Sequence, residues 1–238
     1  GVDIIQTVQD DGKYNNHAKG FEGEHIYKVD GKISDKLNEL TKLLFKGTLR
    51  HSYPHSWRSK APLIYRNTPQ WFISMEKNQL RDTALKSIDE TIFYPAQGQT
   101  RLRSMIETRP DWCISRQRVW GVPLPLFVSK ETGQPLRDQE VIDRIADIYE
   151  KEGSDTWFTE DPQRFLGDKY SIDDFEQVKD VVEVWFDSGS THAFCLEKRE
   201  DLKWPASMYL EGSDQHRGWF HSSLLESSGT RGRAPYES

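Results

Sequence analysis

The feature that most constrains the fold is a change of pattern near the end of the chain. Residues 178–186 form an apolar, β-branched run of the kind found in buried parallel strands, and residues 208–212 have the pattern of a second strand that ends in a glycine. Residues 216–226 follow with the apolar spacing of a helix. A strand, a glycine turn and a helix make the unit of a doubly wound sheet, in which ligands bind beyond the strand ends. The sequence therefore predicts an α/β fold, with two parallel strands and a helix within residues 177–238.

Turn signals and composition divide the remainder of the chain into three further segments. Residues 1–75 hold short β-type runs separated by turns, which predicts a β-rich lobe. Residues 76–130 have helical patterns followed by an irregular stretch with glycine and prolines. Residues 131–176 are acidic and partly helical, which is typical of a surface insertion. The segment 177–238 completes the expected organisation.

Within these segments, some elements are marked more clearly than others. Residues 2–5 and 25–29 are strand-like runs of the predicted β-rich lobe, and residues 33–45 have the apolar period of a helix between turns. Residues 76–112 are expected to be mostly helical. Residues 141–149 form the clearest amphipathic helix of the chain.

The charge balance limits how the chain could bind nucleic acid. Its formal net charge is −6, with a pI near 5.7. A protein that holds nucleic acid by charge alone is usually basic, so any RNA contact must come from a local patch. The densest basic stretch of the sequence consists of Arg101, Arg103, Arg109, Arg116 and Arg118.

Cysteine usage and hydropathy indicate the cellular compartment. Only two cysteines occur, Cys113 and Cys195, which favours a reducing cytoplasm over a disulfide scaffold. No stretch approaches the ~20 apolar residues of a membrane span. The spacing of His51 and His55 with the cysteines matches no common zinc pattern, so we expect no metal site. A cytoplasmic location without membrane attachment follows as the expectation.

The stretch Glu211–Trp219 has the residues of a ligand-binding turn. Its small residues let a ligand approach the backbone, and amide groups at the start of a helix favour an anion. Asp214 and Gln215 could bond ribose hydroxyls or an amine, and Trp219 could form an apolar wall. The alternative is a capped surface helix, in which Ser213 or Asp214 satisfies the free N–H groups.

Two other stretches could also carry binding chemistry. In residues 184–190, a predicted buried strand delivers the Trp185 indole and then a carboxylate; the alternative is a core tryptophan followed by a turn. In residues 111–123, Arg116 and Arg118 could hold a phosphate beside two tryptophans. A charged face over packed aromatic rings explains the same residues without a ligand.

Taken together, these strings resemble one family. Residues 111–123, 184–190 and 209–220 resemble bacterial-type isoleucyl-tRNA synthetases, in that order and at similar spacing. Residues 51–57, continuing to 68–72, are similar to the place where the editing insertion of that family rejoins its catalytic body. The resemblance covers essentially the whole chain. It implies an internal piece with the end of a β-rich editing insertion and part of a Rossmann-type class I catalytic domain.

The resemblance also implies an activity and a site. The family activates isoleucine with ATP and Mg²⁺ to isoleucyl-adenylate, transfers the acyl group to tRNA(Ile), and hydrolyses mischarged valine. An apolar pocket cannot strongly reject a side chain that lacks one methylene, and isoleucyl-tRNA synthetase is itself the standard example of this limit. By resemblance, the isoleucyl-adenylate would contact Glu211, Gly212, Asp214 and Gln215, with Trp219 and Trp185 lining the isoleucine pocket. Arg116 and Arg118 would be candidates for tRNA or phosphate contacts.

Some of the family's segments do not occur in this sequence. We find no His-x-Gly-His type signature and no Lys-Met-Ser-Lys-Ser type loop, both of which the family uses to stabilise phosphates. The resemblance therefore implies that the chain alone is inactive and that its partners include the remainder of a synthetase. The alternative is a non-catalytic module that binds the aminoacyl-adenylate or the acceptor end of tRNA.

Overall fold

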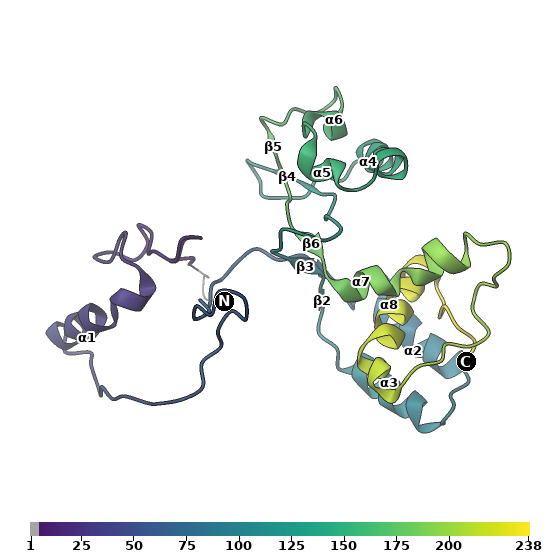
Figure 1. The fold of residues 1–238 in the computed structure, drawn as a ribbon, viewed down its shortest axis with the longest axis horizontal. Helices are drawn as coiled ribbons and strands as arrows, with labels where there is room; N and C mark the ends of the chain where they lie inside the picture. Colours follow the sequence, from purple (N-terminus) through teal and green to yellow (C-terminus); the bar gives the residue numbers. More distant parts are fainter. Residues whose placement is uncertain (1–4) are drawn as a thin grey trace. The chain divides into compact units, whose positions relative to one another are not determined.

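A computed structural model describes residues 5–238 and divides the chain into two compact units (Figure 1). The first unit ends at Pro69, and the second spans Gln70–Ser238. The strand predicted over residues 2–5 lies, apart from its last residue, outside the described part of the chain. Across residues 5–238, no helix combines the length and the apolar character that crossing a membrane requires.

The first unit has little regular structure. It contains the short 3-10 helix η1 (Ile26–Lys28) and the helix α1 (Asp30–Glu39). The strand predicted over residues 25–29 is wrong, because η1 occupies most of this stretch and only His25 forms a bridge, with Lys13. The described part of this unit has isolated β-bridges in place of strands, so the β-rich character of residues 5–69 is not confirmed. The expected helix over residues 33–45 stops early. Leu44 is 99% exposed, and without an apolar surface to cover, the last turn has no tertiary contacts to stabilise it.

The second unit contains a helical core. Its elements are η2 (Lys77–Gln79), α2 (Leu80–Glu90), α3 (Gln97–Glu107), α7 (Val184–Gly189), the π-helix η3 (His192–Leu196), η4 (Ser213–Arg217) and α8 (Trp219–Arg231). The helix α8 contacts both α2 and α7, and residues 221–228 are buried. The core residues are Met75, Leu80, Ala84, Ile88, Leu102, Ile106, Trp112, Leu224, Leu225, Ala234 and Tyr236.

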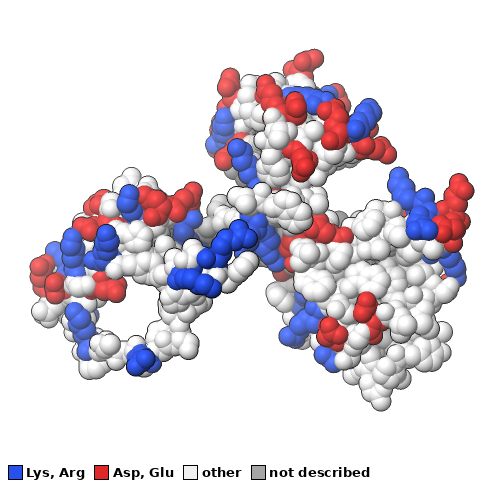
Figure 2. Space-filling model, in the orientation of Figure 1, with Lys and Arg blue, Asp and Glu red and all other residues white. Residues whose placement is uncertain are grey.

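A separate core in the second unit belongs to the acidic segment. It is formed by β4 (Phe127–Ser129), α4 (Gln139–Glu152), α5 (Thr156–Thr159), α6 (Gln163–Leu166) and β5 (Phe175–Gln177). The amphipathic helix predicted over residues 141–149 is confirmed by α4, which Asp138 caps at its start through a 2.9 Å bond to the Glu140 amide. Figure 2 shows acidic side chains spread over the part of the molecule that carries α4, α5 and α6.

The strands of the described residues form three two-stranded antiparallel pairs. These are β1 (Phe72–Ile73) with β2 (Trp112–Cys113), β3 (Ser115–Arg116) with β6 (Val181–Val182), and β4 with β5. The two parallel strands expected within residues 177–238 were therefore a wrong prediction. The mixture of helices and small sheets agrees with an α/β class, while a doubly wound sheet is not present among residues 5–238.

The physical reasons for this difference are local. The run 178–186 forms a strand only at β6, and the chain turns into α7 after Glu183, because a short apolar run does not by itself distinguish a strand from a helix. Residues 208–212 form no strand. Instead, the chain just before them runs parallel to the C-terminal residues, with a bridge between Ala206 and Tyr236 and a 2.9 Å bond from the Tyr209 amide to the Ser238 carbonyl.

Candidate functional site

Gly218 marks the point where three elements of the second unit meet. The glycine separates η4 from α8, so the helix expected over residues 216–226 starts at Trp219 instead. A Cβ atom at Gly218 would lie 2.5 Å from Gln215 Oε1 and 2.9 Å from a ring carbon of Trp185. Only a glycine leaves room for this contact, which brings Trp185 of α7 against the turn between η4 and α8.

Gln215 holds the turn in place through its side chain. Its Oε1 accepts a 2.9 Å hydrogen bond from the Trp219 amide, and its Nε2 donates a 3.0 Å bond to Asp214 Oδ2. The alternative of a helix capped by Ser213 or Asp214 is wrong for α8, because neither side chain bonds its first amides and Gln215 accepts from Trp219 instead. The bond from Gln215 Nε2 holds the Asp214 carboxylate, which remains exposed.

Two indoles reach this junction from different helices. Trp219 stands at the start of α8, and its Nε1 donates a 3.0 Å hydrogen bond to the carbonyl of Ser188 in α7. Trp185 comes from α7 and is 41% exposed. The rings of Trp219 and Tyr209 are stacked, with centroids 4.0 Å apart and planes 4° from parallel. An apolar wall thus borders polar groups at the same place.

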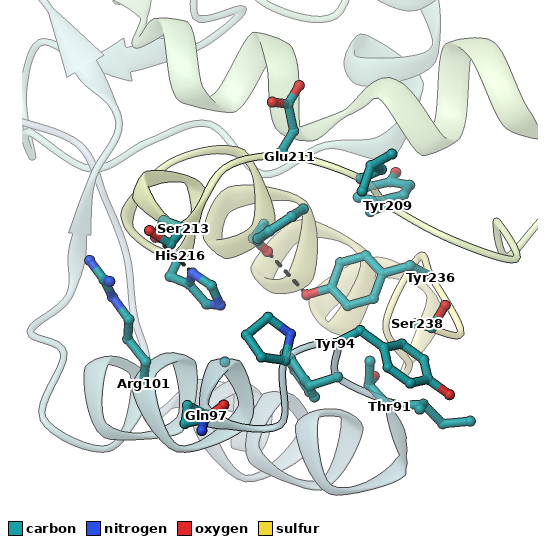
Figure 3. Close-up of a pocket in the computed structure, with 16 residues that line it drawn as sticks. Thr91, Tyr94, Gln97, Arg101, Tyr209, Glu211, Ser213, His216, Tyr236 and Ser238 are labelled. Carbon is teal, nitrogen blue, oxygen red and sulfur yellow. Dashed lines mark hydrogen bonds between the residues drawn. The ribbon is translucent and has the colours of Figure 1, made fainter.

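Glu211 and Gly212 lead into the junction along an exposed loop. The carbonyl of Gly212 accepts a 3.0 Å bond from the Gln215 amide, which starts η4. Glu211 lines a cavity between this loop and the start of α3, and its carboxylate points away from the cavity in Figure 3. The structure therefore brings Trp185, Trp219 and Gln215 together with Asp214, while Glu211 lies at the edge of the group.

Sequence reasoning missed Glu226, whose carboxyl lies against Gly189 of α7 and interacts with Asp187 and Glu183. Glu226 of α8 is 9% exposed, and the cavity for its carboxyl exists because Gly189 has no side chain. Burial, together with the carboxylates of Asp187 and Glu183, raises the pKa of Glu226 to about 9, so this side chain is neutral at pH 7. Burial also raises the pKa of Asp187. A glutamate inside a run of buried small residues is the signal that could have identified Glu226.

The two arginines of the 111–123 stretch differ in their surroundings. Arg116 donates to the carbonyls of Cys113 and Ser115 and pairs with Glu183 at 3.3 Å. Glu183 is buried and also accepts a 2.7 Å bond from the Trp112 indole, so Arg116 serves an internal network. Arg118 is exposed and donates to the Gln117 carbonyl. Contacts of either arginine with tRNA or phosphate stay a prediction.

Metal-ligating side chains do not gather within the part of the chain that the structure describes. No group of three histidine, cysteine, aspartate or glutamate side chains lies close enough together to hold an ion. The two cysteines are free thiols, each half-buried.

Comparisons with known proteins match nearly the whole chain. A family model for tRNA synthetases class I (I, L, M and V) matches residues 7–238. The isoleucine–tRNA ligase of Pelagibacter ubique (strain HTCC1062) is 68% identical over 238 residues, which are 100% of this chain and 26% of the relative. The isoleucine–tRNA ligase of Brucella abortus biovar 1 (strain 9-941) is 58% identical and that of Zymomonas mobilis subsp. mobilis 53%, each over 99% of this chain and 26% and 27% of the relative.

The chain thus spans about a quarter of the length of the curated relatives it matches. The matched range includes every residue of the Gly218 junction and the Arg116 network. By this match, the chain belongs to the class I tRNA synthetases (I, L, M and V).

Proposed function

We propose that this chain is part of an isoleucine–tRNA ligase, which activates isoleucine with ATP to isoleucyl-adenylate and transfers the isoleucyl group to tRNA(Ile). The observation that carries the proposal is the Gly218 junction, where Trp185, Trp219 and the Asp214–Gln215 pair meet within the range that the family model matches. The names of the relatives, all isoleucine–tRNA ligases, support the choice of amino acid.

Each group at the junction has a chemical role in this proposal. A branched alkyl side chain offers only dispersion and apolar burial for recognition, and the two indoles supply such a surface. The exposed Asp214 carboxylate, held by Gln215, is suited to accept hydrogen bonds from ribose hydroxyls or from an ammonium group. Glu211 and Gly212 would contact the adenylate along the loop that leads to Asp214.

The remaining parts of the proposal concern the rest of the enzyme. We propose that residues 177–238 belong to a Rossmann-type catalytic domain completed by other segments of the ligase, and that the first unit belongs to the end of its editing insertion, which hydrolyses mischarged valine. Such an enzyme would work in the cytoplasm. The ligase would use ATP together with Mg²⁺, and the described residues of this chain offer no cluster of ligands for that ion.

The proposal can be tested by grafting the chain into a complete enzyme. The matched segment of the Pelagibacter ubique relative, which is 68% identical, is replaced with this chain, giving a full-length chimera. We expect ATP–pyrophosphate exchange that depends on isoleucine and is weaker with valine. Exchange that prefers leucine or methionine, or that is absent from a folded chimera, would contradict the proposal. The isolated chain should show no exchange above background, since the sequence lacks the family's phosphate-binding signatures.

Substitutions in the chimera test the site itself. Trp219→Ala removes one apolar wall, and an apolar contact of this size is worth ~1.5–3 kcal/mol, so we expect kcat/KM for isoleucine to fall by roughly tenfold or more. Trp57→Ala is the matched control, because Trp57 lies in the first unit and is 78% exposed. An equal loss in both variants would argue against a specific role for Trp219.

A further inference from the structure

We infer that Tyr209 is a positioning residue for the amino-acid pocket, and that it sets the orientation of the Trp219 indole against which isoleucine is recognised. The effect on isoleucine recognition rests on the proposed function. The claim that Tyr209 orients the Trp219 ring rests only on the contact between the two rings. Neither the family match nor the names of the relatives assigns a role to Tyr209.

The indole of Trp219 is held at three points. Its backbone amide is bound by Gln215, and its ring nitrogen donates to the carbonyl of Ser188. The first bond fixes the backbone of Trp219, and the second fixes the Nε1 edge of its ring. The third point is the face of the ring, on which Tyr209 stacks with centroids 4.0 Å apart and planes 4° from parallel. Stacking covers one face of the indole, so in the proposed site the isoleucine side chain would pack on the opposite face.

Tyr209 is itself anchored independently of Trp219. Its amide donates a 2.9 Å bond to the Ser238 carbonyl, and its ring lies 4.8 Å from that of Tyr236 at an angle of 51°. The hydroxyl of Tyr236 donates in turn to the Phe220 carbonyl of α8, as the dashed line in Figure 3 shows. Tyr209 is therefore held by contacts that do not involve the Trp219 side chain.

Because a cavity lies beside Tyr209, the position of the stacked rings should depend on the size of the side chain at position 209. Tyr209 lines a space of about 200 Å³ together with Phe93, Phe220 and Tyr236 (Figure 3). An apolar cavity of ~150 Å³ is large enough for a benzene molecule, so this space could receive a displaced ring. A shorter side chain at position 209 would therefore free the indole face to tilt, because neighbouring atoms do not fill the gap.

The hydroxyl of Tyr209 provides a conservative variant. The oxygen is buried beside Ser223 and forms no hydrogen bond of normal geometry among the described residues. Tyr209→Phe keeps the stacked ring and removes a polar atom that contributes no such bond. Tyr209→Leu keeps an apolar side chain of useful size but loses the flat face. Comparing Tyr209→Phe with Tyr209→Leu therefore separates the effect of ring stacking from the effect of burying an apolar side chain.

The first measurement reads the ring directly in the isolated chain. Tryptophan is replaced by 5-fluorotryptophan, and the ¹⁹F resonance of Trp219 is assigned with Trp219→Phe. We expect this resonance to move in Tyr209→Leu and to stay near its original position in Tyr209→Phe. An unchanged Trp219 resonance in Tyr209→Leu would overturn the inference, whatever the chimera does, because the tyrosine would then not determine the indole's surroundings.

The second measurement reads the consequence in the full-length chimera. Exchange is measured with isoleucine and with valine, and we expect Tyr209→Leu to lower kcat/KM for isoleucine by about tenfold, mainly through KM, and to narrow the isoleucine-to-valine ratio severalfold. In Tyr209→Phe, we expect both kcat/KM for isoleucine and the isoleucine-to-valine ratio to stay close to those of the original chimera. A merely structural role would reduce the active fraction and leave the ratio unchanged, which would overturn the inference. A chimera without isoleucine-dependent exchange counts against the proposed function, while the fluorine measurement still decides the role of Tyr209.

Discussion

The buried carboxyl of Glu226 gives a prediction whose sign and size follow from the structure. Its pKa lies at about 9 in the folded chain, against an ordinary value of 4.5. Between these two values the folded chain keeps a proton that the unfolded chain has released. The folded state therefore binds more protons, and stability falls as the pH rises through this window. Below pH 4.5 the group contributes no such dependence.

The expected slope can be stated per pH unit. One proton held by the folded state and not by the unfolded state corresponds to ~1.4 kcal/mol per pH unit, so the free energy of unfolding should fall by roughly 2–3 kcal/mol between pH 6 and pH 8. Glu226→Gln replaces the protonated carboxyl with a neutral group of similar shape and removes this dependence. The raised pKa of Asp187 acts in the same direction and remains in both proteins.

The assay compares urea denaturation of the original chain and Glu226→Gln at pH 6, 7 and 8, so that the difference isolates one titration. Infrared spectroscopy provides a direct check, because a protonated carboxyl has its own C=O band, which should be present at pH 7 and weaker in Glu226→Gln. Glu150→Gln is the matched control, since Glu150 is exposed on α4. Identical slopes in all three proteins, with no carboxyl band lost at pH 7, would refute the reasoning.

Three further predictions concern packing. Gly218→Ala should displace Trp185 and destabilise the second unit by ~1–3 kcal/mol in urea denaturation, whereas Gly31→Ala, which has open space around it, should cost no stability. Tyr209→Ala should cost more than Tyr209→Phe by at least the ~0.5–1.5 kcal/mol of an aromatic pair, and equal midpoints for the two variants would show that the stack contributes nothing. Trp157→Ala, at a fully buried position, should destabilise the α4–α6 core by ~3–5 kcal/mol, seen as faster hydrogen exchange in α4 and not in α8.

The sequence predicted some elements well for a physical reason. Residues 141–149 alternate apolar and charged side chains with a helical period, and Asp138 and Gly153 mark the two ends, so α4 follows from local information. The run 178–186 carries no such period. Its residues pair with β3 for two positions and then form α7, a result that depends on where Ile114 and Ser115 lie in three dimensions.

In the candidate site, too, some features could be predicted from the sequence and others depend on the folded structure. Trp185, Trp219, Asp214 and Gln215 were identified by their resemblance to a family, and the structure brings them to one place. The cap that Gln215 provides and the stacking of Tyr209 could not be read from the sequence, because a side-chain amide or a ring has no preferred partner until the chain has folded. Contacts of these residues with isoleucine or adenylate stay a prediction.

The helical core of the second unit packs α2 against α8, two helices that lie far apart in the sequence and are therefore synthesised at different times. The helix α2 packs on α8, but α8 begins only at Trp219, long after Glu90 has left the ribosome. At ~5–20 residues per second, the apolar face of α2 would wait on the order of ten seconds for its partner. The α4–α6 core is local in sequence and can form during that interval. The nascent chain would therefore expose α2 to chaperones while an acidic, already folded segment emerges behind it.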